Sequence, residues 1–383
     1  MNNVPAQSKN IVCVHLYDDF SGAANVFAQA LSTLKADGHR LEIIVGDGGT
    51  SSGFIRDSHA VKTVRYRVAA SRLVMLFNLL RAQIVFFFRV LHLCLSSKVD
   101  IVYVNTVLPV GAALAGRLCG KRVIVHLHEV RLGSAALFKV LLAISRRCSH
   151  EFITVSNYVG TTLRLPAEKT HIVANSISPA HWAEAHAPLP DSTSWASCPT
   201  NPFIVVMACS LRWYKGLDSF ALLAERFARV PGSQRAVRFE LLLNADQEEF
   251  DEFLRQQPWP GNLTFIRRPC SVFEHYRKAG MVLNLSHPEG WIETFGLTLL
   301  ESMACGVPVI CPEVGGCVEL FEPGDGGWRI DSRNIDALER KVAELSTDPS
   351  KWIEASDRAR RSALRFAPDQ FAARLTPIFE RDR

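Results

Sequence analysis

The sequence has almost no acidic residues over residues 58–150. This stretch holds fourteen Lys and Arg but only two acids, Asp100 and Glu129, so its charge of +12 leaves −7 for the rest of a chain whose net charge is +5. A basic region of this kind favours contact with an anionic partner, either nucleic acid or a membrane surface. We expect no nucleic-acid partner, because the arginines are embedded in long aliphatic runs without a binding module around them.

The motifs of several metal and cofactor sites are also missing. The ten cysteines include no CxxC pair, and Cys305, Cys311 and Cys317, six residues apart, lack the spacing of zinc ligands. No DxD follows an expected strand, and the first loop, DDFSGAAN, has one glycine instead of the GxGxxG of a dinucleotide oxidoreductase. We therefore expect a protein that requires no metal and no cofactor.

No signal peptide is visible at the start of the chain, where MNNVPAQSKN lacks an apolar segment. We therefore expect a cytoplasmic protein with reduced, buried cysteines. The sequons at Asn262 and Asn284 have no glycosylation role in that compartment.

Length and patterning predict an α/β protein with two domains. The chain has 383 residues, 48% of them hydrophobic, and apolar strand-like runs alternate with helical patterns in both halves. This alternation is typical of parallel sheets covered by helices. We place the boundary between residues 179 and 202, which show no sustained periodicity and are rich in Pro, Ser and Ala.

Two carboxylates, Glu293 and Glu301, stand eight residues apart in SHPEGWIETFGLTLLESMACGVPVICPEVGG, residues 286–316. A strand-like run precedes this stretch, and a turn leads into a helical pattern that ends at Gly306 and Pro308. The first amides of a helix lack internal acceptors and carry positive partial charge, so the turn predicts a phosphate site. Eight residues span about 12 Å, so the two carboxylates would hold opposite ends of an elongated ligand such as a nucleotide sugar.

At these residues the sequence resembles the retaining nucleotide-sugar glycosyltransferases of family 4. The family signature is Glu, seven residues, Glu, a small residue, Met, Ala, any residue, Gly, any residue and Pro, which stands here as ETFGLTLLESMACGVP. The resemblance extends through NIVCVHLYDDFSGAANVFAQAL, DGHRLEIIV, FITVSNYVGTTLRLP, HIVANSI and FIVVMACSLRWYKGLDSFALLAERF. One departure is that Cys209 and Ser210 stand where the family usually has Gly-Arg.

The resemblance implies the GT-B fold, two Rossmann-like parallel-sheet domains facing a cleft. Residues 1–180 would bind the acceptor, residues 200–365 would bind the nucleotide sugar, and the last helix, 366–383, would return to the first domain. The expected reaction moves a sugar from a nucleotide-diphosphate donor to a glycan or lipid-linked glycan, as in polysaccharide, lipopolysaccharide or glycolipid biosynthesis. Alternatives are a GT-B protein that binds donor without transfer, and an epimerase or phosphorylase.

The resemblance also assigns roles in the donor site. Glu293 would contact the donor sugar and steady its ring, while Glu301 would accept hydrogen bonds from the ribose hydroxyls. Fixed cations and amide dipoles would stabilise charge on the departing phosphate. The expected phosphate contacts are Lys215, Arg212 and the amides near Phe295, Gly296 and Leu297.

Two residues of the first half, His128 and Gly22, complete the expected site. His128, in VIVHLHEVRLG, aligns with a family histidine that lies over the donor sugar, and His126 points the same way two residues earlier. For His126 we favour packing in the core or the cleft. Gly22, in the first loop, would let the backbone approach the donor phosphates or the acceptor, unless it is an ordinary turn glycine.

The apolar run at residues 73–95 is long enough to span a bilayer but contains Arg81, Arg89 and His92. On a helical wheel these and Asn78 share one narrow arc. One interpretation is a helix lying along an anionic membrane, attracted by basic neighbours. The alternative is one helix, or two shorter ones, packed on the first domain with its basic groups in water. The basic neighbours are Lys62, Arg65, Arg67 and Arg72.

Overall fold

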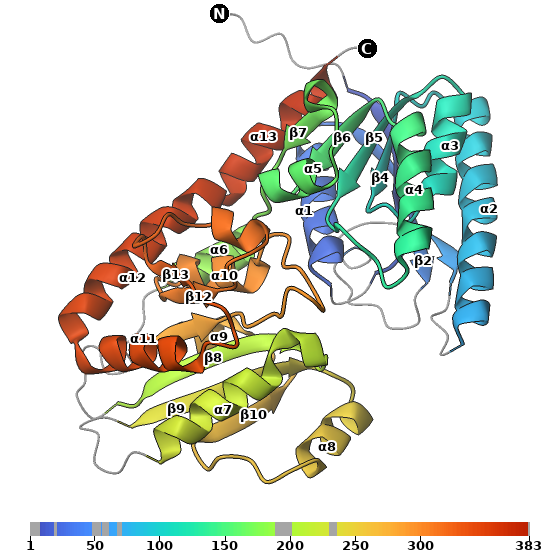
Figure 1. Cartoon of the computed structure of the whole chain (residues 1–383). Helices are drawn as coiled ribbons and strands as arrows, with labels where there is room; N and C mark the ends of the chain where they lie inside the picture. Colours follow the sequence, from blue (N-terminus) through green and yellow to red (C-terminus); the bar gives the residue numbers. More distant parts are fainter. Residues whose placement is uncertain are drawn as a thin grey trace, which may run out of the picture. The chain divides into compact units, whose positions relative to one another are not determined.

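The computed structural model describes residues 8–18, 21–47, 55, 61–66, 71–187, 201–229 and 236–381. The chain folds into two compact units, Met1–Asn175 with Asp369–Arg383, and Ser176–Pro368. Figure 1 labels the helices and strands of both units.

A seven-stranded sheet forms the centre of the N-terminal unit, in the order β3-β2-β1-β4-β5-β6-β7 with every neighbouring pair parallel. The strands are β1 (Asn10–His15), β2 (Arg40–Asp47), β3 (Val61–Arg65), β4 (Ile101–Asn105), β5 (Arg122–Leu127), β6 (Glu151–Thr154) and β7 (Thr170–Ile172). Every residue of β4 and β5 is buried, as expected for central parallel strands with helices on both faces.

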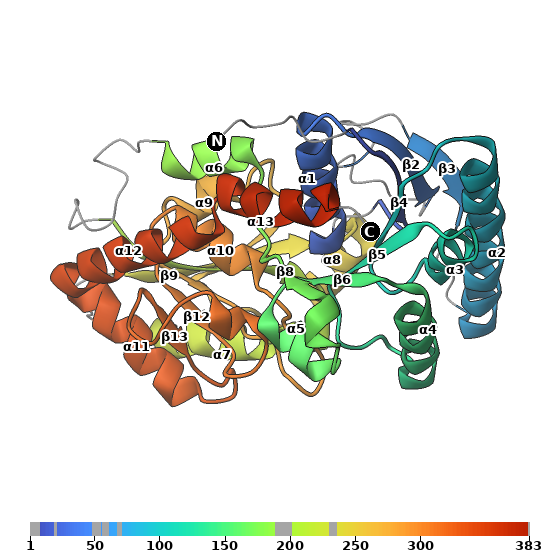
Figure 2. The same ribbon diagram turned by 90° about the horizontal axis from the view of Figure 1, so that it is seen from above.

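The helices of this unit connect its parallel strands or cover its sheet. They are α1 (Gly22–Ala36), α2 (Arg72–Ser96), α3 (Val110–Leu118), α4 (Ala135–Cys148) and α5 (Asn157–Thr162). Ser21 begins α1, because its hydroxyl accepts a hydrogen bond from the Ala24 amide. Helix α2 is a single 25-residue helix that runs beside α3, as Figure 2 shows from above.

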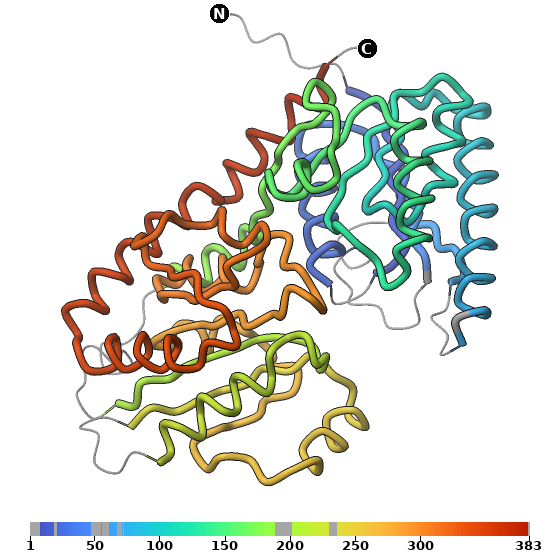
Figure 3. The backbone as a smooth tube through the Cα atoms, in the orientation of Figure 1, coloured from blue at the N-terminus to red at the C-terminus, as the bar shows by residue number. Residues whose placement is uncertain are grey.

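The C-terminal helix α13 (Pro368–Glu380) packs into the N-terminal unit. The Phe379 ring meets the Tyr103 ring edge-on at 5.2 Å in the buried core. Lys9 donates hydrogen bonds to the carbonyls of Glu380 and Arg381, so the red end of the chain lies beside its blue start in Figure 3.

The second unit has a six-stranded sheet in the order β10-β9-β8-β11-β12-β13, again with every neighbouring pair parallel. Its strands are β8 (Phe203–Ser210), β9 (Val237–Asn244), β10 (Leu263–Arg267), β11 (Met281–Leu283), β12 (Val309–Cys311) and β13 (Gly327–Arg329). Its helices are α6 (Pro179–His186), α7 (Leu217–Ala228), α8 (Gln247–Arg255), α9 (Phe273–Tyr276), α10 (Leu297–Ala304), α11 (Ile335–Thr347) and α12 (Pro349–Ala363). The two parallel sheets confirm the predicted α/β class.

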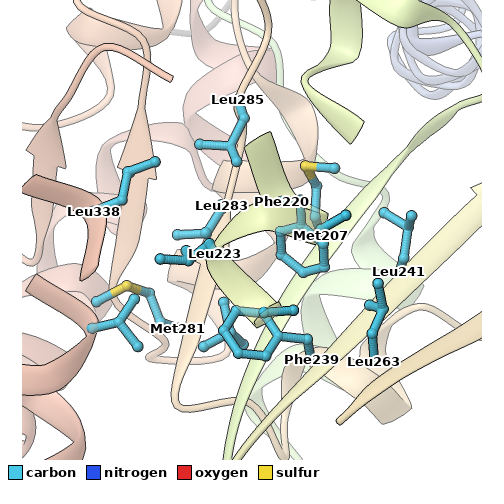
Figure 4. Close-up of a cluster of buried hydrophobic side chains, with 14 of the residues drawn as sticks. Met207, Phe220, Leu223, Phe239, Leu241, Leu263, Met281, Leu283, Leu285 and Leu338 are labelled. Atoms are coloured by element: carbon cyan, nitrogen blue, oxygen red, sulfur yellow. The ribbon is translucent and has the colours of Figure 1, made fainter. Parts of the chain in front are cut away.

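The core of this unit forms where β8, β9 and β11 face α7 and α11. Met207, Phe239, Met281 and Phe220 belong to it, and Figure 4 shows their side chains gathered with surrounding leucines. These side chains are at most 1% exposed. The core therefore fixes the middle strands, whose carboxyl ends carry the candidate site.

The interval that we expected to be an irregular linker contains helix α6. Its N-terminus carries two helix-starting signals, since the Ser178 hydroxyl accepts from the His181 amide and Pro179 occupies the first turn. Its residues belong to the second unit, which begins at Ser176 rather than after residue 180. Residues 188–200 lie outside the described part of the chain.

We expect Phe379→Ala to destabilise the N-terminal unit by about 3–5 kcal/mol, because it leaves a cavity in a fully buried core. Hydrogen exchange at the buried β4 amides would measure this loss as faster opening. The control is Ile353→Ala on α12, a half-exposed side chain whose loss costs little. Equal exchange rates in both variants would show that α13 does not stabilise the sheet.

Candidate functional site

The carboxyl ends of β8 and β11 lie side by side, at the point where the strand order of the second sheet reverses. Ligands of open parallel sheets bind at such a point, outside the carboxyl ends of the strands. The segment after β8 carries Lys215, and the segment after β11 carries Glu293. The sheet topology therefore brings together two residues that are 78 positions apart.

The loop after β8 is shaped by a glycine. A short 3-10 turn, Trp213–Lys215, ends at Gly216, which has a left-handed φ of 75°. A Cβ atom at Gly216 would lie 2.2 Å from the Leu285 carbonyl oxygen, so no other residue fits without moving the backbone. Glycine here holds Lys215 against the end of β11.

The Glu293 carboxylate is held by two side chains. Its Oε2 atom lies 3.3 Å from Lys215 Nζ and accepts a hydrogen bond of 3.2 Å from Asn284 Nδ2. The Lys215 and Glu293 side chains are 17% and 19% exposed, so this ion pair is partly desolvated but reachable from solvent. The geometry joins a cation and a carboxylate at one accessible point.

The backbone of Glu293 is fixed as well. Its carbonyl oxygen accepts a hydrogen bond of 2.8 Å from the Gly316 amide. Gly315 has a φ of 128°, and a Cβ atom there would lie 2.3 Å from that carbonyl oxygen. The Gly315-Gly316 pair therefore lets the backbone after β12 close onto Glu293.

Aromatic rings border the ion pair. Lys215 Nζ lies 5.4 Å from the centre of the Trp291 ring, and the Tyr214 ring stacks on Trp291 at 5.9 Å. A cation over an indole face gains electrostatic stabilisation. A lysine elsewhere on this loop would lose its contacts with the Trp291 ring and with the Glu293 carboxylate, so these contacts are specific to position 215.

Two further polar residues, His287 and Glu289, precede Glu293 in the same loop, and only His287 is buried. Its backbone amide donates to the Tyr214 carbonyl at 2.8 Å, and its Nδ1 atom lies 2.9 Å from the Ser332 hydroxyl. Glu289 is exposed and pairs with Arg333 at 2.8 Å. His287 thus links the segment after β11 to the segments that contain Tyr214 and Ser332, whereas Glu289 lies at the surface.

Helix α10 begins directly after Glu293 and the turn at Phe295 and Gly296. Gly296 is the N-cap with a φ of 90°, and no side chain caps the helix, which starts at Leu297. The Leu299 and Leu300 amides donate to the Gly296 carbonyl, so the amides that can meet an anion are those at the very start of α10, at Gly296 and Leu297. Phe295 is buried, so its part in this turn is to anchor it.

Glu301 lies one turn into α10, and its side chain is almost completely buried. Burial raises the pKa of its carboxyl to about 8, and the adjacent Tyr276 offsets part of this rise. Without a bound ligand, the Glu301 carboxyl is therefore mostly protonated at neutral pH. Its charge state would change if a ligand supplied hydrogen-bond donors.

Arg212 lies on the same loop as Lys215 but directs its guanidinium elsewhere. It pairs with Glu249 on α8 at 3.3 Å, and both side chains are about half exposed. An exposed pair of this kind contributes little stability, so a phosphate could compete for Arg212. Its phosphate contact remains a prediction.

The N-terminal unit has its own polar cluster at the carboxyl ends of β1, β4 and β5. His128 Nε2 lies 2.8 Å from Asn105 Oδ1, and Asn105 Nδ2 lies 3.0 Å from His15 Nδ1. The Asn105 amide also donates to the Ala23 carbonyl at 3.2 Å, which links the cluster to the start of α1. Since the Asn105 oxygen can only accept, His128 carries its proton on Nε2.

Burial keeps the His126 and His128 side chains neutral. Desolvation lowers the pKa of His126 to about 3 and lowers that of His128 well below its usual value. His126 is fully buried and its Nδ1 atom lies 2.8 Å from the Tyr103 hydroxyl, as its expected core position implies. Gly22 is exposed as the first residue of α1.

Two polar partners, Asn284 and Asn105, were not singled out as site residues from the sequence. Each follows an apolar run, MVL before Asn284 and IVYV before Asn105, at the carboxyl end of a central strand. A polar residue at that position was the available signal. Among the described residues no group of three or more His, Cys, Asp or Glu side chains could hold a metal ion.

Two protein families match the chain, one in each half. Residues 20–181 match "Glycosyltransferase Family 4" and residues 196–364 match "Glycosyl transferases group 1". A solved structure of HepE from Anabaena with UDP-glucose superposes with a TM-score of 0.72 at 17% identity, covering 97% of this chain and 99% of that chain. The chain has the GT-B fold.

Curated relatives of this GT-B protein match it only in part. Sucrose synthase of Acidithiobacillus caldus is 36% identical over 91 residues, 22% of this chain and 12% of that protein. The D-inositol 3-phosphate glycosyltransferase of Thermobispora bispora is 36% identical over 104 residues, 27% of this chain and 23% of that protein. The matched segments thus span less than a quarter of either relative.

The buried Glu301 predicts a specific pH dependence of stability. The pKa of this carboxyl is about 8 in the folded GT-B protein, whereas in the unfolded chain it has its ordinary value of about 4.5. Stability should therefore fall as pH rises from about 4.5 to 8 and level off above that. Each pKa unit corresponds to about 1.4 kcal/mol, so Glu301 contributes a loss on the order of a few kcal/mol.

Glu301→Gln should remove this fall, since the amide stays neutral at every pH. We expect a higher melting temperature than wild type at pH 8 and an equal one near pH 4.5. Glu322→Gln, at an exposed glutamate, is the matched control and should follow wild type. A parallel pH profile for Glu301→Gln and wild type would contradict an abnormal Glu301.

Proposed function

We propose that the protein is a retaining glycosyltransferase that moves a hexose from a nucleotide-diphosphate donor to an acceptor. The observation that carries the proposal is the Lys215–Glu293–Asn284 cluster at the strand reversal of the second sheet, next to the uncapped start of α10. One cation, one carboxylate and the first amides of α10 suit a sugar joined to a diphosphate.

In this mechanism the amides at Gly296 and Leu297, together with Lys215, bind the phosphates and stabilise the negative charge that grows as the diphosphate leaves. Glu293 hydrogen-bonds the sugar and steadies its ring. The acceptor attacks the same face that the diphosphate leaves, and a phosphate oxygen takes the acceptor proton. Retention follows without a covalent intermediate on the protein.

Glu301 and His128 have supporting roles. Ionised Glu301 accepts hydrogen bonds from the two ribose hydroxyls, which add to the stabilisation that the adjacent Tyr276 gives its carboxylate. Neutral His128, oriented by Asn105, contacts the uncharged sugar. Arg212 leaves its exposed pair with Glu249 to reach the phosphates, and Gly22 lets the start of α1 approach the ligand.

Similar proteins support a nucleotide-sugar donor. The HepE structures contain UDP, glucose or UDP-glucose, and the matched relatives include glycosyltransferases by name. For this chain we propose a cytoplasmic enzyme that needs no metal. Its acceptor is a glycan or a lipid-linked glycan.

The decisive experiment is thermal stabilisation by a panel of nucleoside diphosphates and nucleotide sugars. A ligand at about 100 times its Kd adds roughly 2.7 kcal/mol to stability. We expect the nucleotides of one base to raise the melting temperature clearly. Lys215→Ala should raise the Kd for these nucleotides about tenfold or more, because a charge-assisted phosphate contact is lost. Lys351→Ala, which removes an exposed pair with Glu344, is the matched control.

Glu293→Gln separates binding from transfer. It keeps the size of the side chain and should leave nucleoside diphosphate binding intact, while sugar transfer falls about a hundredfold or more. A bound donor without turnover in the wild type, across a panel of acceptors, would favour a binding protein. Conversion of the donor sugar without any acceptor would favour an epimerase.

A further inference from the structure

Helix α2 exposes a continuous apolar stripe along most of its length. Six large side chains, three, four or seven residues apart, share one face, each at least 55% exposed. Only 22% of the most apolar window of this helix is buried, although it is long and apolar enough to span a membrane. The six side chains are Leu73, Phe77, Leu80, Ile84, Phe88 and Leu95.

The opposite face of α2 is buried in its own unit. Leu79, Ala82, Phe86, Val90 and Cys94 are at most 7% exposed there. A helix packed in this way cannot cross a bilayer without leaving the unit. The stripe can, however, meet an apolar phase while the helix lies flat.

Cations border the stripe on one side. Arg81 donates to the Arg65 carbonyl at 2.6 Å, and Arg89 donates to the Thr63 carbonyl at 2.8 Å. Both arginines therefore bind backbone carbonyls of β3, the edge strand of the sheet, and their side chains stay exposed to water. Their guanidinium groups remain exposed at this rim.

A hollow of about 560 Å³ lies beside the stripe, between α2 and the sheet edge. Lys62, Arg89 and His92 give it basic walls, while Phe88 and Leu93 give it apolar ones. Lys62 is exposed and pairs with Glu42. A lipid has matching chemistry, a phosphate headgroup joined to acyl chains.

We propose that this face of the N-terminal unit docks on the surface of an anionic bilayer, with α2 in the interface plane. The stripe enters the acyl region, and the hollow takes a lipid phosphate. The charge pattern selects lipid over a second copy of the chain. A twofold contact through this stripe with antiparallel α2 helices would bring the same basic rims together and repel. Arg67 and the side chain of Arg72 lie outside the described residues.

The test is co-sedimentation of the full chain with phosphatidylcholine vesicles, with and without phosphatidylglycerol. We expect binding to the anionic vesicles that high salt weakens. Leu80→Ser combined with Ile84→Ser should lower the partition coefficient about tenfold or more, because two apolar side chains are lost from the interface. Lys62→Gln should lower it about fivefold.

The matched control is Leu222→Ser combined with Ile353→Ser, two exposed apolar residues of the second unit, which should bind like wild type. Circular dichroism checks folding of each variant, and the nucleotide response of the second unit should not change. Undiminished binding by the stripe variant, or no binding by wild type, would overturn the proposal. So would a dimer in sedimentation velocity that the stripe variant dissociates.

Discussion

The Glu293 carboxylate can sit at the end of β11 only because Lys215 and Asn284 hold its charge. A carboxylate that is only 19% exposed would otherwise lack compensation for lost water. Lys215 in turn depends on Gly216, where any side chain would strike the Leu285 carbonyl. The ion pair therefore links the geometry of two loops to the order of the strands beneath them.

The same topology builds polar clusters in both units. In each sheet the central neighbours, β1 with β4 and β8 with β11, end beside one another at the strand reversal. An asparagine ends or follows the second strand of each pair, Asn105 in one unit and Asn284 in the other. Asn105 orients a neutral histidine, whereas Asn284 orients a charged glutamate. The first cluster therefore suits an uncharged hydroxyl, and the second suits a ligand with separated charges.

The alternation of strand-like and helical patterns predicted the two parallel sheets, and the glutamate signature led us to the segment that contains Glu293. Both features are local properties of the chain. The pairing of Lys215 with Glu293 depends on strand order, which joins residues 78 positions apart. Helix α6 was missed although Ser178 and Pro179 signal a helix start. The depth of Glu301 and the turn of Arg212 toward Glu249 also depend on tertiary packing, which no local pattern contains.

The helical wheel of α2 placed Asn78, Arg81, Arg89 and His92 on one arc, and it left the use of the remaining surface open. Folding divides that surface into a buried face and an exposed apolar face, with the arginines between them on the β3 carbonyls. Cations that already satisfy backbone acceptors are fixed in place, so they can meet lipid phosphates with little further loss of side-chain freedom. The two arginines thus cover backbone carbonyls of the edge strand β3, and they also hold their charges in fixed positions beside the apolar stripe. Both act within the N-terminal unit, whereas the proposed donor residues Lys215 and Glu293 belong to the second unit.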